Sequence, residues 1–214
     1  MSSIALTLRS ALILRAMRHV VCRMLAVLRV GIVLPIAAVL LVGRGDAWES
    51  QRLLAAAQKM GPNTLVQAQA MVQMVAAAAN ESEQNRLRTV NTFFNRRIEY
   101  RDDRDVWGVP DYWATPLESL GKGAGDCEDF ALQKRKELME AGIPRQALLM
   151  TVVTDENGAG HAVLTLRSNR GDFVLDNRTD KILGWQSTNY VFVKMQSEQH
   201  PNEWQKIGDP SNAT

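Results

Sequence analysis

The sequence predicts an α+β fold in which helices come first and an antiparallel sheet follows. Apolar residues recur at helical spacing between residues 49 and 96. The same spacing returns from Cys127 to Ala141, among lysines and glutamates. From residue 147 onwards, apolar and polar residues alternate, which is typical of strands. Helices and strands that are segregated along the chain in this way favour α+β over alternating α/β.

Three helices are predicted before residue 100. The first covers residues 49–60, and the Gly61-Pro62 pair ends it and starts the second, over residues 63–80. The alanine- and methionine-rich stripe of the second helix is expected to pack in the core. The third helix covers residues 82–96 and carries apolar residues at helical spacing: Leu87, Val90, Phe93 and Phe94. The alternating charges of residues 101–105 predict a solvated loop.

Residues 107–126 predict an irregular loop, because glycine, proline and aromatic residues dominate them. Trp107, Tyr112 and Trp113 lie in this loop. Loops rarely carry so much apolar area without packing it or building a cleft. The helix that follows starts at Cys127, its apolar stripe is expected to include Phe130, Ala131, Leu138 and Met139, and Gly142 is its C-cap signal.

Strands are predicted over residues 147–154, 161–167, 172–177 and 190–196. If residues 168–171 form a hairpin loop, Arg167 pairs with Asp172. His161 and Asp176 are then diagonal neighbours on one face of the sheet, within reach of an imidazole–carboxylate hydrogen bond. The face that carries His161 is expected to lie over the start of the Cys127 helix.

The N-terminal segment, residues 1–47, predicts a signal peptide or an N-terminal membrane anchor. It combines an arginine-rich start, an apolar run over residues 30–43 and a small-x-small site at Gly45 and Ala47. This segment has a net charge of +5, whereas the whole chain has +2, so the remainder carries −3. That balance argues against a nucleic-acid partner. We expect an exported domain, outside the cytoplasm, over residues 48–200 and a polar C-terminal tail over 201–214.

Cys127 is the one cysteine that remains outside residues 1–47, and it lies where a glycine-rich loop becomes a helix. The first turn of a helix favours a thiolate. His161 and Asp176 follow in the chain, which is the set that nucleophilic acyl transfer requires. We predict that Cys127 attacks, His161 transfers the proton and Asp176 orients the imidazole. The Trp113 indole N–H is a candidate oxyanion donor, and the alternative is that Trp113 only forms a wall of the cleft.

Three carboxylates flank the thiol: Asp126, Glu128 and Asp129. They suit the positive end of a helix, yet they also raise the pKa of a neighbouring thiol. A bound cation would cancel their field, and carboxylate oxygens suit Ca²⁺. Zinc is disfavoured, because one cysteine and two histidines outside residues 1–47 make no closed ligand set.

Four motifs carry a family resemblance: Tyr-Trp-Ala-Thr-Pro (112–116), Gly-Asp-Cys-Glu-Asp-Phe-Ala (125–131), His-Ala-Val-Leu (161–164) and Val-Leu-Asp-Asn (174–177). The stretch from about residue 91 to 195 resembles the bacterial transglutaminase-like cysteine proteinases. The resemblance implies a papain-like fold and a triad of Cys127, His161 and Asp176. It also implies Ca²⁺ bound by the acidic residues beside the cysteine, a surface adhesin as the protein substrate, and an inner-membrane cyclic-di-GMP receptor as the regulator.

Two other functions use the same residues. A transglutaminase or amide-transferring enzyme would have the same triad, and an amine instead of water would resolve the thioester. A Ca²⁺-responsive binding module would have lost catalysis altogether and would bind its partner regardless of Cys127. Incorporation of an amine into a glutamine substrate identifies the first, and a thiol that no active-site probe labels identifies the second.

Overall fold

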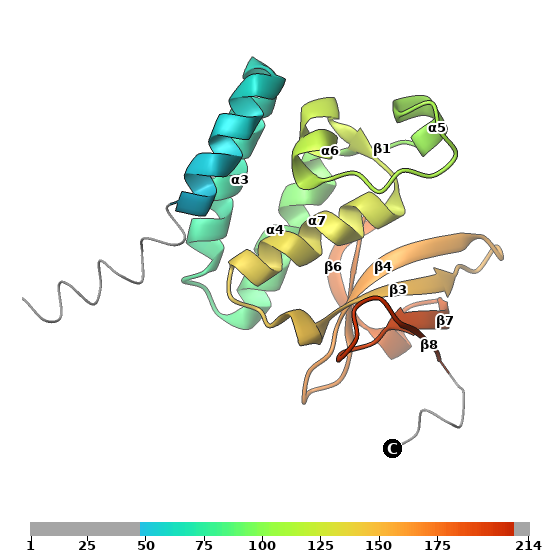
Figure 1. Cartoon of the computed structure of the whole chain (residues 1–214). Helices are drawn as coiled ribbons and strands as arrows, with labels where there is room; N and C mark the ends of the chain where they lie inside the picture. The colour runs from blue at the N-terminus through green and yellow to red at the C-terminus, as the bar shows by residue number, and fades with distance from the viewer. Residues whose placement is uncertain (1–47, 208–214) are drawn as a thin grey trace, which may run out of the picture. The chain divides into compact units, whose positions relative to one another are not determined.

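The computed structural model describes residues 48–207 (Figure 1). The chain divides into two units, of which residues 1–52 form the first. In that unit the described residues, 48–52, are helical. In the second unit, the helix continues to residue 60. The helices that follow are α3 (Pro62–Ala78), α4 (Glu83–Arg97), α5 (Asp103–Val106), α6 (Pro116–Lys122) and α7 (Cys127–Glu140). Two short 3₁₀ helices are η1 (Arg145–Ala147) and η2 (Trp185–Ser187).

A six-stranded antiparallel sheet follows the helices, in the order β6-β5-β4-β3-β7-β8. Its strands are β3 (Leu148–Thr154), β4 (Gly160–Leu166), β5 (Phe173–Asp176), β6 (Thr179–Gly184), β7 (Val191–Gln196) and β8 (Trp204–Lys206). A separate parallel pair consists of β1 (Glu99–Tyr100) and β2 (Ala124–Gly125). The predicted α+β class, with helices before the sheet, is confirmed.

The main core lies between the helices and one face of the sheet. Helix α7 packs against β4, with α4 beside it, as Figure 1 shows. The buried side chains Phe130 and Leu138 of α7 belong to the same apolar cluster as Leu148, Leu164 and Leu175 of the sheet. Burial of such side chains is the main favourable term for folding. A smaller cluster on the other face contains Val153, Val163 and Val174, with Tyr190 and Phe192 packed against it.

The predicted register of the hairpin is confirmed. Strand β4 pairs with β5 through Leu166↔Phe173, Thr165↔Val174 and Leu164↔Leu175, the same register that pairs residue 167 with residue 172. The ladder ends there, and on the other side of β5 its pairing with β6 shifts register between Val174 and Asp176. The first half of β4 therefore has no β5 partner in this ladder.

One prediction about the sheet is wrong, namely that the face carrying His161 lies over the start of the Cys127 helix. Side chains alternate between the two faces of a strand. Leu164 and Leu166 belong to the cluster that packs on α7, whereas Val163 belongs to the other face, and by alternation so does His161. The start of α7 thus does not lie under the His161 face. It lies beside the first half of β4, which pairs with β3 but not with β5, and there the Ala162 backbone N–H is available to it.

Two helices lie in segments that the sequence predicts to be irregular. Residues 103–106 form α5, and the predicted solvated Asp103 is only 3% exposed. Residues 116–122 form α6, which begins with a capping box between Thr115 and Glu118 and ends at Gly123, with φ 68°. Both signals of α6 stand in the sequence, but the surrounding glycines and aromatics obscure them.

The sheet has two strands more than predicted. Strand β6 forms the edge beside β5, and β8 pairs with β7 through Gln196↔Trp204. Residues 204–206 of the expected polar tail therefore belong to the sheet. The expected signal or anchor, residues 1–47, lies outside the described residues. Among residues 48–207, no helix has both the length and the apolarity that a membrane crossing needs.

Candidate active site

Cys127 is the first residue of α7, and its backbone is held in place by the parallel pair β1–β2. The Glu99 N–H donates to Gly123 O at 2.9 Å, and the Arg101 N–H donates to Gly125 O at 3.0 Å. Gly125 allows the next turn of the helix to approach closely, because a Cβ there would lie 2.7 Å from Asp129 Oδ2. The loop therefore presents the thiol at the start of a helix, as predicted.

His161 and Asp176 form a buried pair, as the hairpin register predicts. His161 Nε2 lies 2.9 Å from Asp176 Oδ1, and both residues are 4% exposed. Burial favours the neutral form of Asp176, yet the hydrogen bonds from His161 and Tyr190 hold the pKa of this carboxyl below its ordinary value. Because Nε2 is engaged, Nδ1 is the ring nitrogen left to exchange a proton with a thiol.

The Cys127 thiol lies next to this pair but has other hydrogen-bond partners. Its Sγ accepts from the Ala162 N–H at 3.4 Å and the thiol donates to Glu128 Oε2 at 3.1 Å. Within residues 48–207 it has no hydrogen bond to His161. Cys127 and His161 nevertheless line one cavity of about 270 Å³, together with Trp113 and Trp204.

The surroundings oppose ionisation of the thiol, which the helix start alone would favour. Burial, then the hydrogen bond and charge of Glu128, and the charge of Asp126 together raise the pKa of Cys127 to about 12, although the Ala162 N–H lowers it. The predicted effect of flanking carboxylates on the thiol is thus present in the structure. The exposed face of the cavity is formed in part by Trp113, which is 48% exposed.

A cluster of carboxylates lies behind the thiol. Asp103, Asp126 and Asp129 each offer an oxygen, and these atoms lie within 4.8 Å of one another; a second such set combines Asp103, Asp111 and Glu128. Within the described residues, one buried oxygen each of Asp103, Asp126 and Asp129 has no hydrogen-bond partner. Buried unpaired carboxylate oxygens at this spacing match the ligands that Ca²⁺ takes, so these side chains fit a calcium ion.

The protonation of this cluster reflects its crowding. Burial, followed by the charge of Glu128, raises the pKa of Asp126 to about 8. Burial also raises the pKa of Asp129 to about 7, against the hydrogen bond from the Ala114 N–H, and raises that of Asp103. Without a cation, the carboxylates therefore retain protons that isolated acids would have lost.

Backbone donors hold the two most buried acids in place. The Ala114 N–H donates to Asp129 Oδ1 at 2.7 Å, and the Tyr112 N–H donates to Asp103 Oδ2. The loop that carries Tyr112 and Ala114 thus covers the acidic cluster. Sequence reasoning missed Asp103 and Asp111, because a run of alternating charges resembles a solvated face. Their distance from Cys127 along the sequence gives no sign that they belong to the cluster. The β1–β2 pairing joins segments that are far apart in the chain and places α5 near the start of α7.

The comparison with known families agrees with this geometry. The family described as bacterial transglutaminase-like cysteine proteinase matches residues 63–212. The chain belongs to the bacterial transglutaminase-like cysteine proteinases. It is therefore a cysteine peptidase, and the family resemblance predicted from the four motifs is confirmed. No curated protein matches the chain.

Solved structures of Legionella pneumophila LapG are similar to this proteinase. One has 27% sequence identity and a TM-score of 0.61, with 68% of this chain and 82% of LapG covered. A calcium-bound form has the same values. An EGTA-treated form has 25% identity and a TM-score of 0.64, with 74% and 85% covered. The predicted transglutaminase-like fold is thus confirmed.

Proposed function

We propose that this cysteine peptidase is an endopeptidase whose nucleophile, base and orienting acid are Cys127, His161 and Asp176. The observation that carries the proposal is the buried His161–Asp176 hydrogen bond beside a cavity that the helix-start thiol shares. His161 Nδ1 takes the thiol proton as Sγ attacks the acyl carbon, and later returns it to the leaving amine. Water then hydrolyses the thioester. Asp176 holds the imidazole in one tautomer and stabilises its cation.

The tetrahedral intermediate needs hydrogen-bond donors. The backbone N–H of Cys127 is one candidate, and the Trp113 indole N–H is the second. Their presence at the same cavity supports this assignment. Replacement of Trp113 by phenylalanine keeps the wall of the cleft and removes the donor, so a fall in kcat at unchanged KM separates the two roles of this side chain.

The triad is tested with Cys127→Ala and His161→Ala, using as substrate a surface adhesin from the protein's own cells. We expect both variants to lose cleavage. His200→Ala is the matched control, because His200 is exposed and its side chain is outside the cavity. The proposal is wrong if Cys127→Ala cleaves the adhesin as fast as the unmodified chain does.

We further infer that the peptidase requires calcium, held by Asp103, Asp126, Asp129 and the nearby Asp111 and Glu128. The unpaired buried oxygens and the known calcium-bound form of LapG support this set. When bound, a divalent cation supplies positive charge that cancels the effect of these carboxylates on the thiol.

Calcium binding is measured by calorimetric titration of the full chain with CaCl₂. Asp103→Asn should weaken binding by about tenfold or more, because it removes one charged ligand from the centre of both carboxylate sets. Asp105→Asn, an exposed position in the same short helix, should have no effect. Equal affinities for the two variants, or full peptidase activity in excess EGTA, would contradict the calcium requirement.

The N-terminal segment and the family resemblance support a proposal about location and partners. We propose that the protein acts in the periplasm, on a large surface adhesin, under an inner-membrane cyclic-di-GMP receptor. The arginine-rich apolar start of the chain supports export. Fractionation of cells, with cleavage of the adhesin followed in the periplasmic fraction, tests the location directly.

A further inference from the structure

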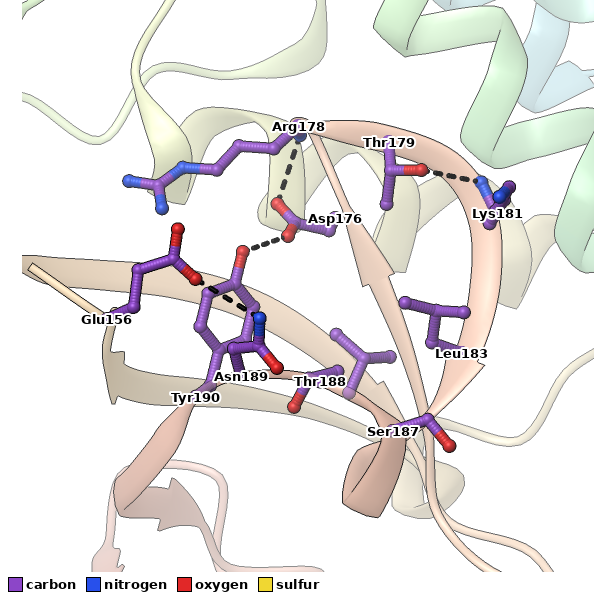
Figure 2. A pocket seen from close by; sticks show the side chains of 11 residues that line it. Glu156, Asp176, Arg178, Thr179, Lys181, Leu183, Ser187, Thr188, Asn189 and Tyr190 are labelled. Atoms are coloured by element: carbon purple, nitrogen blue, oxygen red, sulfur yellow. Dashed lines mark hydrogen bonds between the residues drawn. The ribbon is translucent and has the colours of Figure 1, made fainter.

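The Asp176 carboxylate is held by three donors that come from three different elements. His161 Nε2 of β4 and the Arg178 N–H of the β5–β6 turn lie 2.9 Å and 3.1 Å from Oδ1. The Tyr190 hydroxyl, just before β7, donates to Oδ2 at 2.5 Å. Figure 2 shows Tyr190 and Arg178 meeting this carboxylate from two sides. Within residues 48–207, Tyr190 is the one side chain or amide that binds Oδ2.

The ring of Tyr190 contacts the imidazole as well as the apolar face of the sheet. Its centroid lies 5.6 Å from that of His161, with an interplanar angle of 59°. The same ring packs against the small cluster of Val153, Val163 and Val174. One side chain therefore hydrogen-bonds the carboxylate and flanks the imidazole that this carboxylate orients.

The backbone that presents Tyr190 is tied to the neighbouring turns. Asn189 Nδ2 donates to Glu156 Oε2 at 3.2 Å, and Arg178 donates to Asp155 Oδ2 at 2.9 Å. Strand β7 begins at Val191, directly after Tyr190. Tyr190, Asn189, Glu156 and Arg178 surround a cavity of about 260 Å³ next to Asp176, seen in Figure 2. These ties limit the movement of the tyrosine hydroxyl away from Asp176.

We propose that Tyr190 is a positioning residue of the thiol–imidazole chemistry, which it serves by locking the Asp176 carboxylate against rotation. The inference rests on the proposed function. Rotation about χ2 of an aspartate is soft and broad, so an oxygen with a single donor loses its orientation when that donor is removed. His161 Nε2 shares Oδ1 with a backbone N–H, and a rotated carboxylate would no longer hold the imidazole in line with the thiol.

Other charges face this group and set its pH response. Arg178 faces the Tyr190 hydroxyl, and Lys134 of α7 faces Asp176 and Asp180. Tyr190 donates to the charged form of Asp176, and this bond contributes to the lowered pKa of the carboxyl. Loss of the hydroxyl should let Asp176 take up a proton at a higher pH. The effect of the substitution should therefore grow as the pH falls.

The test measures alkylation of Cys127 in the full chain by iodoacetamide, which reads the thiolate without any knowledge of the substrate. The modified Cys127 peptide is quantified by mass spectrometry across the pH range, in calcium-containing buffer. We compare Tyr190→Phe and His161→Ala with the unmodified chain. Tyr112→Phe is the matched control, because it removes another tyrosine hydroxyl that donates to a carboxylate, that of Glu118. Thermal unfolding of each variant is recorded in parallel.

We expect Tyr190→Phe to slow alkylation by about three- to tenfold near pH 6 and by progressively less as the pH rises, because Asp176 is then ionised with or without the tyrosine hydroxyl. His161→Ala should slow alkylation near pH 6. If it does, the inference is overturned when Tyr190→Phe slows alkylation equally at all pH values or does not slow it at all. If His161→Ala has no effect, the proposed thiol–imidazole pair itself is wrong, and the role of Tyr190 falls with it.

Discussion

Lys134 provides a sharp test of how burial acts on charge in this protein. Its side chain is 0% exposed in the middle of α7, and within residues 48–207 its Nζ has no hydrogen-bond partner. Its Nζ lies 5.4 Å from the centroid of the Phe130 ring, a favourable cation–π contact. Burial lowers the pKa of Lys134 from 10.5 to about 7, against the attraction of Asp176 and Asp180.

Proton linkage gives the size of the effect of Lys134 on the stability of the protein. A base with a lowered pKa binds its proton less tightly in the folded protein than in the unfolded chain. Stability should therefore rise with pH between about 7 and 10.5, by up to about 1.4 kcal/mol per pH unit. Between very low and very high pH, the free energy of unfolding should change by about 5 kcal/mol. At pH 7, the buried lysine should destabilise the protein by about 4 kcal/mol relative to high pH. Replacement by methionine keeps most of the volume and removes the charge.

We therefore expect Lys134→Met to stabilise the protein by about 2–4 kcal/mol at pH 7 and by about 1 kcal/mol or less near pH 10. Urea unfolding at several pH values, followed by circular dichroism, measures both. Lys136→Met is the control, because Lys136 is partly exposed and pairs with Glu140 on the surface of the same helix. The reasoning fails if Lys134→Met is no more stable than the unmodified chain at pH 7, or if its gain is the same at every pH.

Three further predictions concern the acidic cluster and the loop beside it. Gly125→Ala should weaken calcium binding by about tenfold or more, because the new Cβ would lie 2.7 Å from Asp129 Oδ2. Titration with CaCl₂ measures this, and the control Gly184→Ala should bind calcium as the unmodified chain does. Thr115→Ala removes the N-cap of α6 and should lower the free energy of unfolding by about 1 kcal/mol in urea; a change below the error of the measurement would contradict that role. Asp126 and Asp129 hold protons more tightly when folded, so the stability of the calcium-free protein should fall as the pH rises from about 4 to about 8, and a flat profile would refute this.

Local patterns were sufficient for much of the candidate site. The turn residues between the two strands predict the hairpin register, and that register alone predicts the His161–Asp176 contact. The helix start at Cys127 follows from the glycine-rich loop and the apolar spacing after it. Such features involve residues that are close in the chain, where turn chemistry and periodicity act directly.

Contacts between distant segments were not predictable in the same way. Asp103 is 26 positions away from Asp129 in the chain, and a parallel two-residue pair brings their segments together. Tyr190 reaches Asp176 from the segment just before β7, although β4 and β3 separate β7 from β5 in the sheet, and no local pattern encodes this contact. Lys134 stands between Phe130 and Leu138 at helical spacing, yet its complete burial depends on α4 and the sheet covering that stripe, while the predicted stripe residue Met139 is 40% exposed.

The sequence by itself determined the α+β order, the family motifs, the hairpin and the three residues of the proposed triad, because short-range propensity and pairing specify them. Only the tertiary structure decided where β5 leaves β4 and frees the Ala162 N–H for the thiol, and which acids surround the helix start. The physical reason is that burial and charge at this site arise from segments far apart in the chain. Their proximity is a property of the packed fold and not of any one stretch of residues.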